Sequence, residues 1–244
     1  MTDEEKLEYD AKRVRTRELA AEFNSKGDPL GWFDALYKEA GGDIEQIPWA
    51  DLEPNRYFAD WAAQTNLSGD GRRALVVGCG LGDDAKFLND LGFKVTAFDI
   101  SPNAIAWAKK LYGGVAIDFK VGDLLNPDPA WLGAFDFVLE IYTIQPLPIE
   151  LRPQVIDAVA SFVGPGGRLV VVTRGRGDDD PVDEVPWPLS RRDLSRFDAN
   201  GLRELSLQEI WEPENEQLRF VIEYERSEGE HRPAVGGPVG KGVE

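Results

Sequence analysis

The stretch Arg72–Asp99, which reads RRALVVGCGLGDDAKFLNDLGFKVTAFD, limits the possible folds of this chain more than any other. It begins with a short apolar run, Ala74–Val77, that is typical of a buried strand. Glycines then recur at every second position, Gly78, Gly80 and Gly82, and such a series predicts a tight turn. We therefore expect a strand that runs directly into a glycine-rich turn.

A helix and a second strand follow this turn. Asp83 or Asp84 can cap the helix, and Gly92 stands where the helix would end. The second strand, Lys94–Phe98, ends on the carboxylate of Asp99. This order of elements is the first half of a nucleotide-binding α/β sheet, in which the acid accepts hydrogen bonds from ribose hydroxyls. We expect a ligand across the carboxyl ends of these two strands.

The spacing of the glycines distinguishes between two kinds of ligand. A dinucleotide-binding turn has a glycine at its sixth position, where this chain has Asp83. A carboxylate there would repel a pyrophosphate at the start of the helix. The series Gly78 to Gly82 fits a ligand such as S-adenosylmethionine better, because Asp83 and Asp84 are tolerable near an ammonium or sulfonium. For Asp83 the alternative is a helix cap in a solvated turn.

The composition favours a protein that acts on small molecules. The 244 residues are 42% hydrophobic and 29% charged, which suits one domain with additions at one end. The net charge of −17 argues against nucleic acid or an anionic membrane as partner, because either would be repelled. The start, MTDEEK, has no signal-peptide features and no run is long enough to span a membrane, so we expect a cytoplasmic protein. The oligomeric state stays open.

Two residue counts limit the chemistry. Cys79 is the one cysteine and His231 the one histidine of the chain. These counts exclude an internal disulfide, histidine-based metal sites and hydrolysis by Ser-His-Asp or Cys-His groups. We expect no metal site, and any catalysis must come from carboxylates, tyrosines or positioning.

The rest of the chain alternates between strands and helices. Five strands are expected at residues 74–77, 94–98, 117–121, 135–141 and 168–173. Helices are expected at residues 4–24, 30–40, 54–64, 102–111, 151–163 and 191–197. Such alternation predicts a doubly wound, Rossmann-like α/β sheet with right-handed crossovers. Two final strands, 202–211 and 218–226, should pair as an antiparallel hairpin at the sheet edge.

The chain divides into three parts on this interpretation. Residues 1–66 are expected to form a helical cap over the sheet, in which an aromatic stripe around Trp32 serves as core or a docking face, or alternatively as a ligand contact. Residues 67–226 form the sheet domain, and the loop 174–190 is long enough to act as a lid. Residues 227–244 have little to bury, and we expect them to be disordered.

From Trp32 to about Arg226 the chain resembles the class I S-adenosylmethionine-dependent methyltransferases. The likeness rests on LVVGCGLG, on the acid in AFDIS, on GDLL after the third strand, on FDFVLE in the fourth and on VGPGGRLVVV before the fifth. It implies a seven-stranded sheet, mostly parallel, whose last strand is antiparallel. It also implies S-adenosylmethionine as the cofactor and a small molecule as the methyl acceptor.

The resemblance assigns roles to individual residues. The implied cofactor-binding residues are Trp32, Trp49, Gly78, Cys79, Gly80, Gly82, Asp99, Ile100, Asp123, Leu124 and Glu140. The glycine turn would hold the methionine part, Asp99 the ribose, and Ile100 a face of the adenine. Asp123 would accept from the adenine amino group, unless it is simply an acid of the turn. Glu140 would bind the ammonium of the cofactor.

The glycine turn looks most like that of the thiopurine and halide/thiol methyltransferases. In that branch a segment with two tryptophans, here Trp32 and Trp49, folds over the cofactor. Ile141 departs from the thiopurine enzymes, which have an arginine at this position. The narrower likeness implies a small acceptor, with sulfur or a halide favoured.

The catalytic residues are less well determined. Glu140 and Tyr142 are the candidates for a general base, and Tyr142 and Gln145 for the substrate pocket. A thiol or halide acceptor needs no strong base, because transfer is then mostly a matter of orientation and exclusion of water. Two alternatives remain open: a natural-product O- or N-methyltransferase, which would need a base, and a catalytically silent cofactor-binding partner protein.

Overall fold

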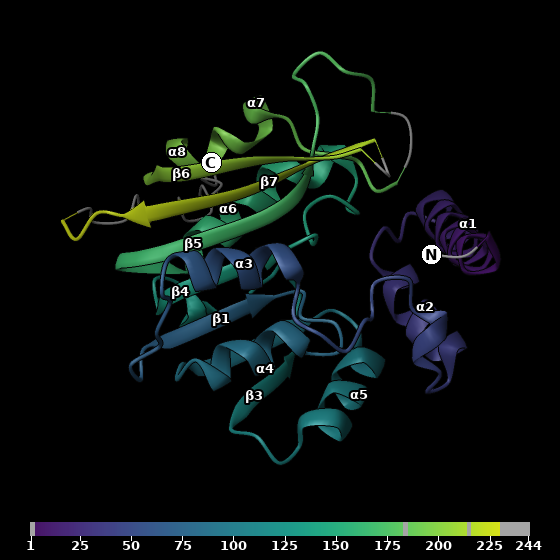
Figure 1. The fold of residues 1–244 in the computed structure, drawn as a ribbon, viewed down its shortest axis with the longest axis horizontal. Helices are drawn as coiled ribbons and strands as arrows, with labels where there is room; N and C mark the ends of the chain where they lie inside the picture. The colour runs from purple at the N-terminus through teal and green to yellow at the C-terminus, as the bar shows by residue number, and fades with distance from the viewer. Residues whose placement is uncertain (1–2, 183–184, 214–215, 230–244) are drawn as a thin grey trace, which may run out of the picture.

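The computed structural model describes residues 3–182, 185–213 and 216–229, with side chains from Lys12 onward. In this part of the chain seven strands form one sheet in the order β3-β2-β1-β4-β5-β7-β6 (Figure 1). The strands are β1 (Arg73–Val77), β2 (Lys94–Asp99), β3 (Ile117–Val121), β4 (Phe135–Ile141), β5 (Val163–Gly175), β6 (Leu202–Glu212) and β7 (Gln217–Arg226). The expected doubly wound sheet is confirmed.

The strand directions also agree with the prediction. β1 pairs in parallel with β2 and β4, with Val77 opposite Phe98 on one side and Glu140 on the other. β7 runs antiparallel to both β5 and β6, with Val171 opposite Ile222. The hairpin therefore closes this side of the sheet, and β6 is its edge strand. The carboxyl ends of β1, β2 and β4 meet at one edge, where a ligand of an open α/β sheet binds.

Helices cover both faces of the sheet and its ligand-binding edge (Figure 1). They are α1 (Asp3–Ser25), α2 (Gly31–Ala40), α3 (Arg56–Gln64), α4 (Asp83–Asp90), α5 (Pro102–Tyr112), α6 (Arg152–Phe162), α7 (Arg191–Leu194) and α8 (Arg196–Ala199). In Figure 1, α3 and α4 lie in front of the sheet and α6 behind it, while α1 and α2 lie beyond the carboxyl ends of the strands. The expected helical cap, residues 1–66, therefore has two parts. The segment before α3 covers the carboxyl ends of the strands, whereas α3 itself packs on a face of the sheet.

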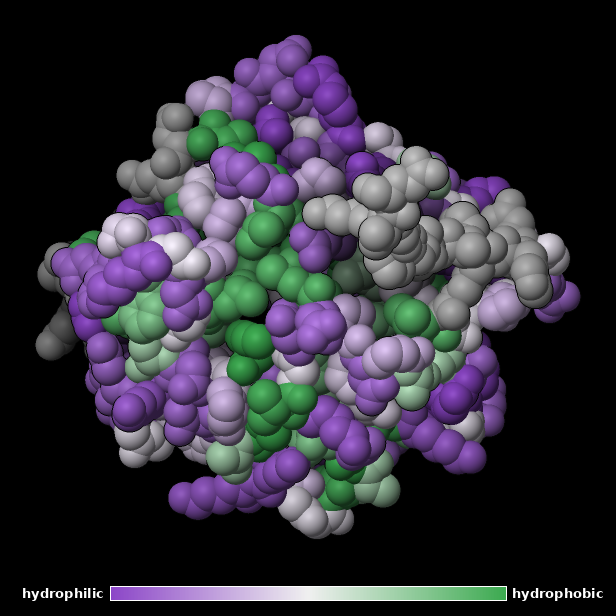
Figure 2. All heavy atoms as spheres, turned by 180° about the vertical axis from the view of Figure 1, so that it is seen from behind, coloured by the Kyte–Doolittle hydropathy of each residue, from purple (hydrophilic) through white to green (hydrophobic). Residues whose placement is uncertain are grey.

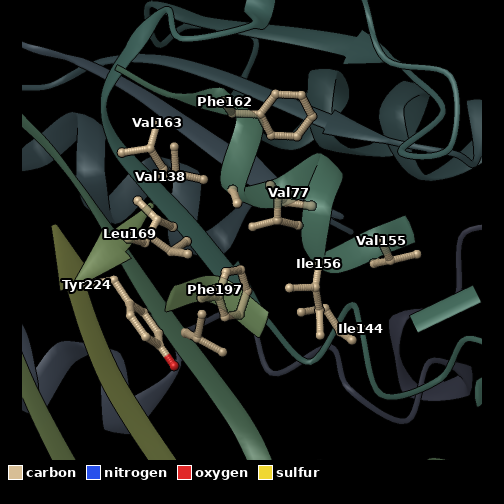
Figure 3. Close-up of a cluster of buried hydrophobic side chains, with 14 of the residues drawn as sticks. Val77, Val138, Ile144, Val155, Ile156, Phe162, Val163, Leu169, Phe197 and Tyr224 are labelled. Atoms are coloured by element: carbon tan, nitrogen blue, oxygen red, sulfur yellow. The ribbon is translucent and has the colours of Figure 1, made fainter. Parts of the chain in front are cut away.

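The sheet is buried on both faces because its central strands are apolar at successive positions. On the rear face, Val77, Val138 and Leu169 pack against Ile156 of α6 and Phe197 of α8 (Figure 3). On the front face, alternate residues of the same strands pack against Phe58 and Trp61 of α3 and against Leu88 of α4. A third cluster joins α2 to the start of α5. These contacts fix the strands whose ends form the site.

Several expected boundaries were wrong. The helix expected from Pro54 begins at Arg56, because the side chain of Asn55 caps it by accepting from Tyr57 N–H. The helix expected at 191–197 is two short helices, and β5 begins at Val163, before its expected start.

The N-cap of α4 is Gly82, not Asp83 or Asp84. Gly82 has a φ of 93°, and a Cβ there would lie 2.8 Å from the Phe119 ring, so glycine is required. Asp83 and Asp84 occupy the first turn instead, and Tyr112 Oη donates to Asp83 Oδ1. Asp83 is thereby joined to Tyr112 of α5, and Asp84 accepts from Asn55 N–H just before α3.

The surface is largely hydrophilic. On the face shown in Figure 2, hydrophilic residues surround a band of hydrophobic residues that runs through the middle. Within the described part of the chain, no helix is both long and apolar enough to cross a bilayer. The expected disordered tail, 227–244, lies outside the described residues from position 230 onward.

Candidate active site

A cavity of about 670 Å³ lies at the carboxyl ends of the central strands. Its volume is within the range of small-molecule and cofactor sites. The predicted site residues that line it are Trp32, Trp49, Gly78, Cys79, Gly80, Asp99, Ile100, Asp123, Leu124, Tyr142 and Gln145. The structure thus brings together residues from the segment before α3 and from the ends of four strands, β1 to β4. Gly82 and Glu140, which were also predicted, do not line the cavity.

Asp99, at the end of β2, has the geometry needed to hold a pair of hydroxyls. Its Oδ2 accepts from Gly80 N–H and its Oδ1 from Ser101 N–H, both at 2.9 Å. Burial raises the pKa of Asp99, and these two hydrogen bonds oppose that effect. Each oxygen keeps a second lone pair, and the residue borders the cavity. A buried carboxylate with accepting capacity left fits the ribose of a nucleoside.

The glycine turn brings the backbone of β1 to the cavity without side chains in the way. Gly80 has a φ of 52°, and a Cβ there would lie 3.0 Å from Tyr37 Oη. Gly78 has a φ of 60°, and a Cβ there would lie 2.4 Å from Thr143 Oγ1. Burial raises the pKa of the Cys79 thiol between them, so Cys79 is a neutral wall and not a nucleophile. The turn therefore fits the extended methionine part of S-adenosylmethionine.

Aromatic side chains from the segment before α3 form one wall of the cavity. Trp49 Nε1 donates to Tyr37 Oη at 2.9 Å. Trp32 is 1% exposed and stacks on Phe33 with ring centroids 3.8 Å apart. Trp32 is therefore core and cavity wall at once, which combines the two roles that the sequence left open.

Asp123 and Leu124 follow β3, beside Asp99. Asp123 Oδ1 accepts from Leu125 N–H at 2.8 Å, so one of its oxygens does hold the turn. Both residues also border the cavity. Gly122 N–H, just before them, donates to the carbonyl oxygen of Asp99 at 3.0 Å, and their role toward an adenine remains a prediction.

Glu140, which the sequence predicts to take part in binding or catalysis, does not line the cavity. Glu140 is 0% exposed, and its Oε1 accepts from Thr143 N–H at 2.7 Å and from Ile144 N–H at 3.0 Å. Burial raises its pKa to about 7, while these two bonds oppose that effect. Glu140 therefore holds the turn after β4 through Oε1, while its Oε2 is buried without a hydrogen-bond partner among the described residues.

Tyr142 and Gln145 both reach the cavity, and they differ in what holds them. Tyr142 has a φ of 56° and a ring that lies 5.5 Å from Arg219 Cζ. Burial raises its pKa, so its phenol stays protonated and is unsuited to act as a base. Gln145 Oε1 accepts from Arg174 N–H at 2.9 Å and from Thr173 Oγ1 at 3.2 Å. Gln145 thus ties the turn after β4 to the end of β5.

Asp84 is a cavity residue whose chemical role the sequence did not reveal. Its Oδ1 accepts from Asn55 N–H at 2.8 Å, and Asp84, Asn55 and Tyr142 all line the cavity. Burial raises the pKa of Asp84 to about 7, and the neighbouring charge of Asp83 adds to this. A carboxylate with such a pKa in a cleft is a candidate general base.

A second group beyond Tyr142 was also missed. Arg56 Nη2 and Tyr57 Oη both donate to Glu212 Oε1. Arg219 Nη2 donates to Glu212 Oε2 at 2.9 Å. All four residues border the cavity, although Arg56 and Tyr57 are more than 150 positions from Glu212. No local motif signals such a cluster, because only the pairing of α3 with the β6–β7 hairpin creates it.

Comparisons of the sequence identify a methyltransferase domain. Residues 74–167 match the family model described as "Methyltransferase domain". The ubiquinone biosynthesis O-methyltransferase of Xanthomonas euvesicatoria pv. vesicatoria (strain 85-10) is 32% identical over 147 residues, 59% of this chain and 56% of that protein. The corresponding enzyme of Xylella fastidiosa (strain 9a5c) is 35% identical over 111 residues, 43% of each chain. This chain therefore spans only about half the length of these curated relatives.

Solved structures share the fold at low sequence identity. A protein studied for the conversion of a disulfide bond into a thioacetal group during echinomycin biosynthesis has a TM-score of 0.64 and 22% identity, covering 81% of this chain and 93% of that one. The 1,6-didemethyltoxoflavin-N1-methyltransferase of Burkholderia thailandensis, with bound 1,6-didemethyltoxoflavin and S-adenosylhomocysteine, has a TM-score of 0.60 and 17% identity, covering 80% and 85%.

Residues 74–167 match a methyltransferase domain, and the described residues share their fold with solved methyltransferase structures. Both findings agree with the resemblance to the class I S-adenosylmethionine-dependent methyltransferases. The curated relatives named above are O-methyltransferases, so they do not support the narrower likeness to the thiopurine and halide/thiol branch.

Proposed function

We propose that this protein methylates an oxygen atom of a small molecule, with Asp84 as the general base. The observation that carries the proposal is the position of Asp84, which lines the same cavity as the predicted cofactor residues and has a pKa of about 7. A hydroxyl acceptor must lose its proton during transfer, and a group that titrates near neutral pH serves this purpose best. The similarity to O-methyltransferases supports an oxygen acceptor over sulfur.

The cofactor end of the cavity would be formed by the glycine turn and the ends of β2 and β3. Asp99 would accept from the ribose hydroxyls, Ile100 and Leu124 would enclose the adenine, and Gly80 would lie against the methionine part. When bound, S-adenosylmethionine supplies a methyl group activated by its sulfonium. The acids of the first turn of α4 are compatible with this cation.

Asp84 would act on the acceptor, not on the cofactor. Its carboxylate would take the hydroxyl proton as the acceptor oxygen bonds to the methyl carbon, while the bond from that carbon to sulfur breaks and S-adenosylhomocysteine leaves as the product. Asn55 N–H fixes the carboxylate by donating to Oδ1. Tyr142, whose phenol stays protonated, would donate a hydrogen bond or form a wall.

Exclusion of water would come from the segment before α3 and from the loop after β5. Trp32 and Trp49 of the expected helical cap form one wall, and Val185 of the expected lid lies at the same cavity. Arg17 Nε donates to the carbonyl oxygen of Val185 at 3.3 Å, which joins the two parts. Closing them over the acceptor would protect the transfer from competing solvent.

The experiment is an assay of the purified chain with S-adenosylmethionine and a panel of catechols, phenols, amines and thiols, read by mass spectrometry. Methylated phenolic products, absent with Asp84→Asn, support the proposal. Methylation of thiols alone, unaffected by Asp84→Asn, would restore the sulfur or halide interpretation, which needs no base. Binding of the cofactor without consumption across the panel would favour the silent partner protein.

A further inference from the structure

We propose that the acceptor carries a planar anionic group, such as a carboxylate, and that Arg219 binds it. This inference rests on the proposed function, because it concerns the acceptor end of the same cavity. It names a binding residue that contributes to neither the cofactor end nor the proton transfer.

Arg219, in β7, is enclosed by two aromatic rings. Its Cζ lies 5.5 Å from the centroid of Tyr142 and 5.8 Å from that of Tyr57. The side chain is 12% exposed and borders the cavity. Aromatic faces hold a guanidinium in one orientation without using its hydrogen-bond donors. Arg219 is therefore fixed in place while most of its donors stay free.

The free donors are the main evidence. Nη2 donates to Glu212, but Nε and Nη1 are buried and have no hydrogen-bond partner within the described part of the chain. Leaving buried charged donors unpaired destabilises the fold, and a ligand that accepts from them would remove this penalty. A carboxylate accepts two hydrogen bonds in one plane, and either Nη1 or Nε can form such a donor pair with the remaining N–H of Nη2.

Charge at this end of the cavity points to the same ligand. Glu212 is shared between Arg56 and Arg219, so the group holds two cations for one anion. Arg174 lines the same cavity. In a chain of net charge −17, this concentration of arginines makes a local site that attracts anions.

The test compares benzoate with its neutral isostere benzamide, in calorimetric titrations of the full chain saturated with S-adenosylhomocysteine. We expect benzoate to bind at least about tenfold more tightly than benzamide. Arg219→Gln should remove this preference, and Arg219→Lys should reduce it, because lysine keeps the charge without the planar donors. Arg203→Gln is the matched control, since Arg203 pairs with Glu225 on the surface of the same hairpin and should keep the full preference.

The proposal is overturned by equal affinities for the two probes, by a preference that survives in Arg219→Gln, or by no saturable benzoate binding below about 10 mM. If Arg219→Gln does not fold, Arg219→Lys decides, and an unchanged preference there contradicts the planar anion site. Failure of the wild-type protein to bind S-adenosylhomocysteine would instead contradict the proposed function, so the two failures are distinguishable.

Discussion

The backbone N–H of Asn55 donates to Asp84 Oδ1 at 2.8 Å, and this bond joins the start of α3 to the first turn of α4. Asn55 also caps α3 through its side chain, which accepts from Tyr57 N–H and Phe58 N–H. One residue therefore fixes a helix that packs on the sheet and a carboxylate that faces the cavity. The position of Asp84 is determined by the fold and not by a flexible loop.

S-adenosylhomocysteine and S-adenosylmethionine should stabilise the protein, whereas NAD should not. Asp83 stands in the first turn of α4, where a pyrophosphate would lie. Burial raises the pKa of its carboxyl group, but the acid still occupies this position. At a hundredfold excess over the dissociation constant, the gain in unfolding free energy should be about 2.7 kcal/mol. Thermal unfolding measures this directly, and a shift with NAD alone would mean that the cofactor is wrongly assigned.

Replacing Asp99 with alanine should weaken cofactor binding by about 10- to 100-fold while the fold survives. A hydrogen bond to a charged group contributes about 1.5–3 kcal/mol, and the carboxylate would accept from ribose hydroxyls. Calorimetry with S-adenosylhomocysteine gives the affinity. Asp118→Ala, which removes an exposed acid of β3, is the control and should bind like the wild type. Equal affinities for the two variants would place the ribose elsewhere.

Glu140 should make the protein less stable as pH rises. Its pKa is raised from 4.5 to about 7 in the folded state, so the folded chain holds a proton that the unfolded chain has lost. The protonated Glu140 contributes its full stabilisation when the pH is below the pKa of the unfolded state. This contribution is lost as the pH rises through the pKa of the folded state. Glu140→Gln cannot titrate, so it should gain up to about 3 kcal/mol relative to the wild type between about pH 5 and pH 8.

Urea unfolding of both proteins at the two pH values provides the measurement. At each pH the measurement gives the difference in unfolding free energy between the two proteins, and this difference is compared between the two pH values. The substitution alters packing equally at both pH values, so packing does not affect the comparison. A difference that stays constant would show that Glu140 is ionised in the folded state throughout this range.

The local parts of the fold could be predicted from the sequence because the signals are local. The apolar run before Gly78, the spacing of the glycines and the acid at Asp99 lie within one continuous stretch, and each has its own conformational reason. One end of the cavity is built from these residues, so their meeting there was predictable in outline. Their role in holding a cofactor remains a prediction.

The acceptor end could not be predicted in this way. Glu140 was expected in the cavity because it ends β4, but the following turn folds over its carboxyl group. Arg219 and Glu212 lie on neighbouring strands of the final hairpin, and they meet Tyr57 only when α3 packs beside them. Nothing in the sequence near any of these residues signals the contact, because the contact is made by tertiary packing.

The general base can be tested most directly by comparing the kcat/KM of Asp84→Asn and Asp83→Asn with the best phenolic acceptor found. Both substitutions remove one acid from the first turn of α4, and Asp83 retains an oxygen that accepts from Tyr112 when it becomes asparagine. We expect Asp84→Asn to lose about 10²- to 10⁴-fold and Asp83→Asn less than about tenfold, with the wild-type rate falling below about pH 7. Comparable small losses in both variants, with no acid limb in the wild type, would contradict a role for Asp84 as the general base.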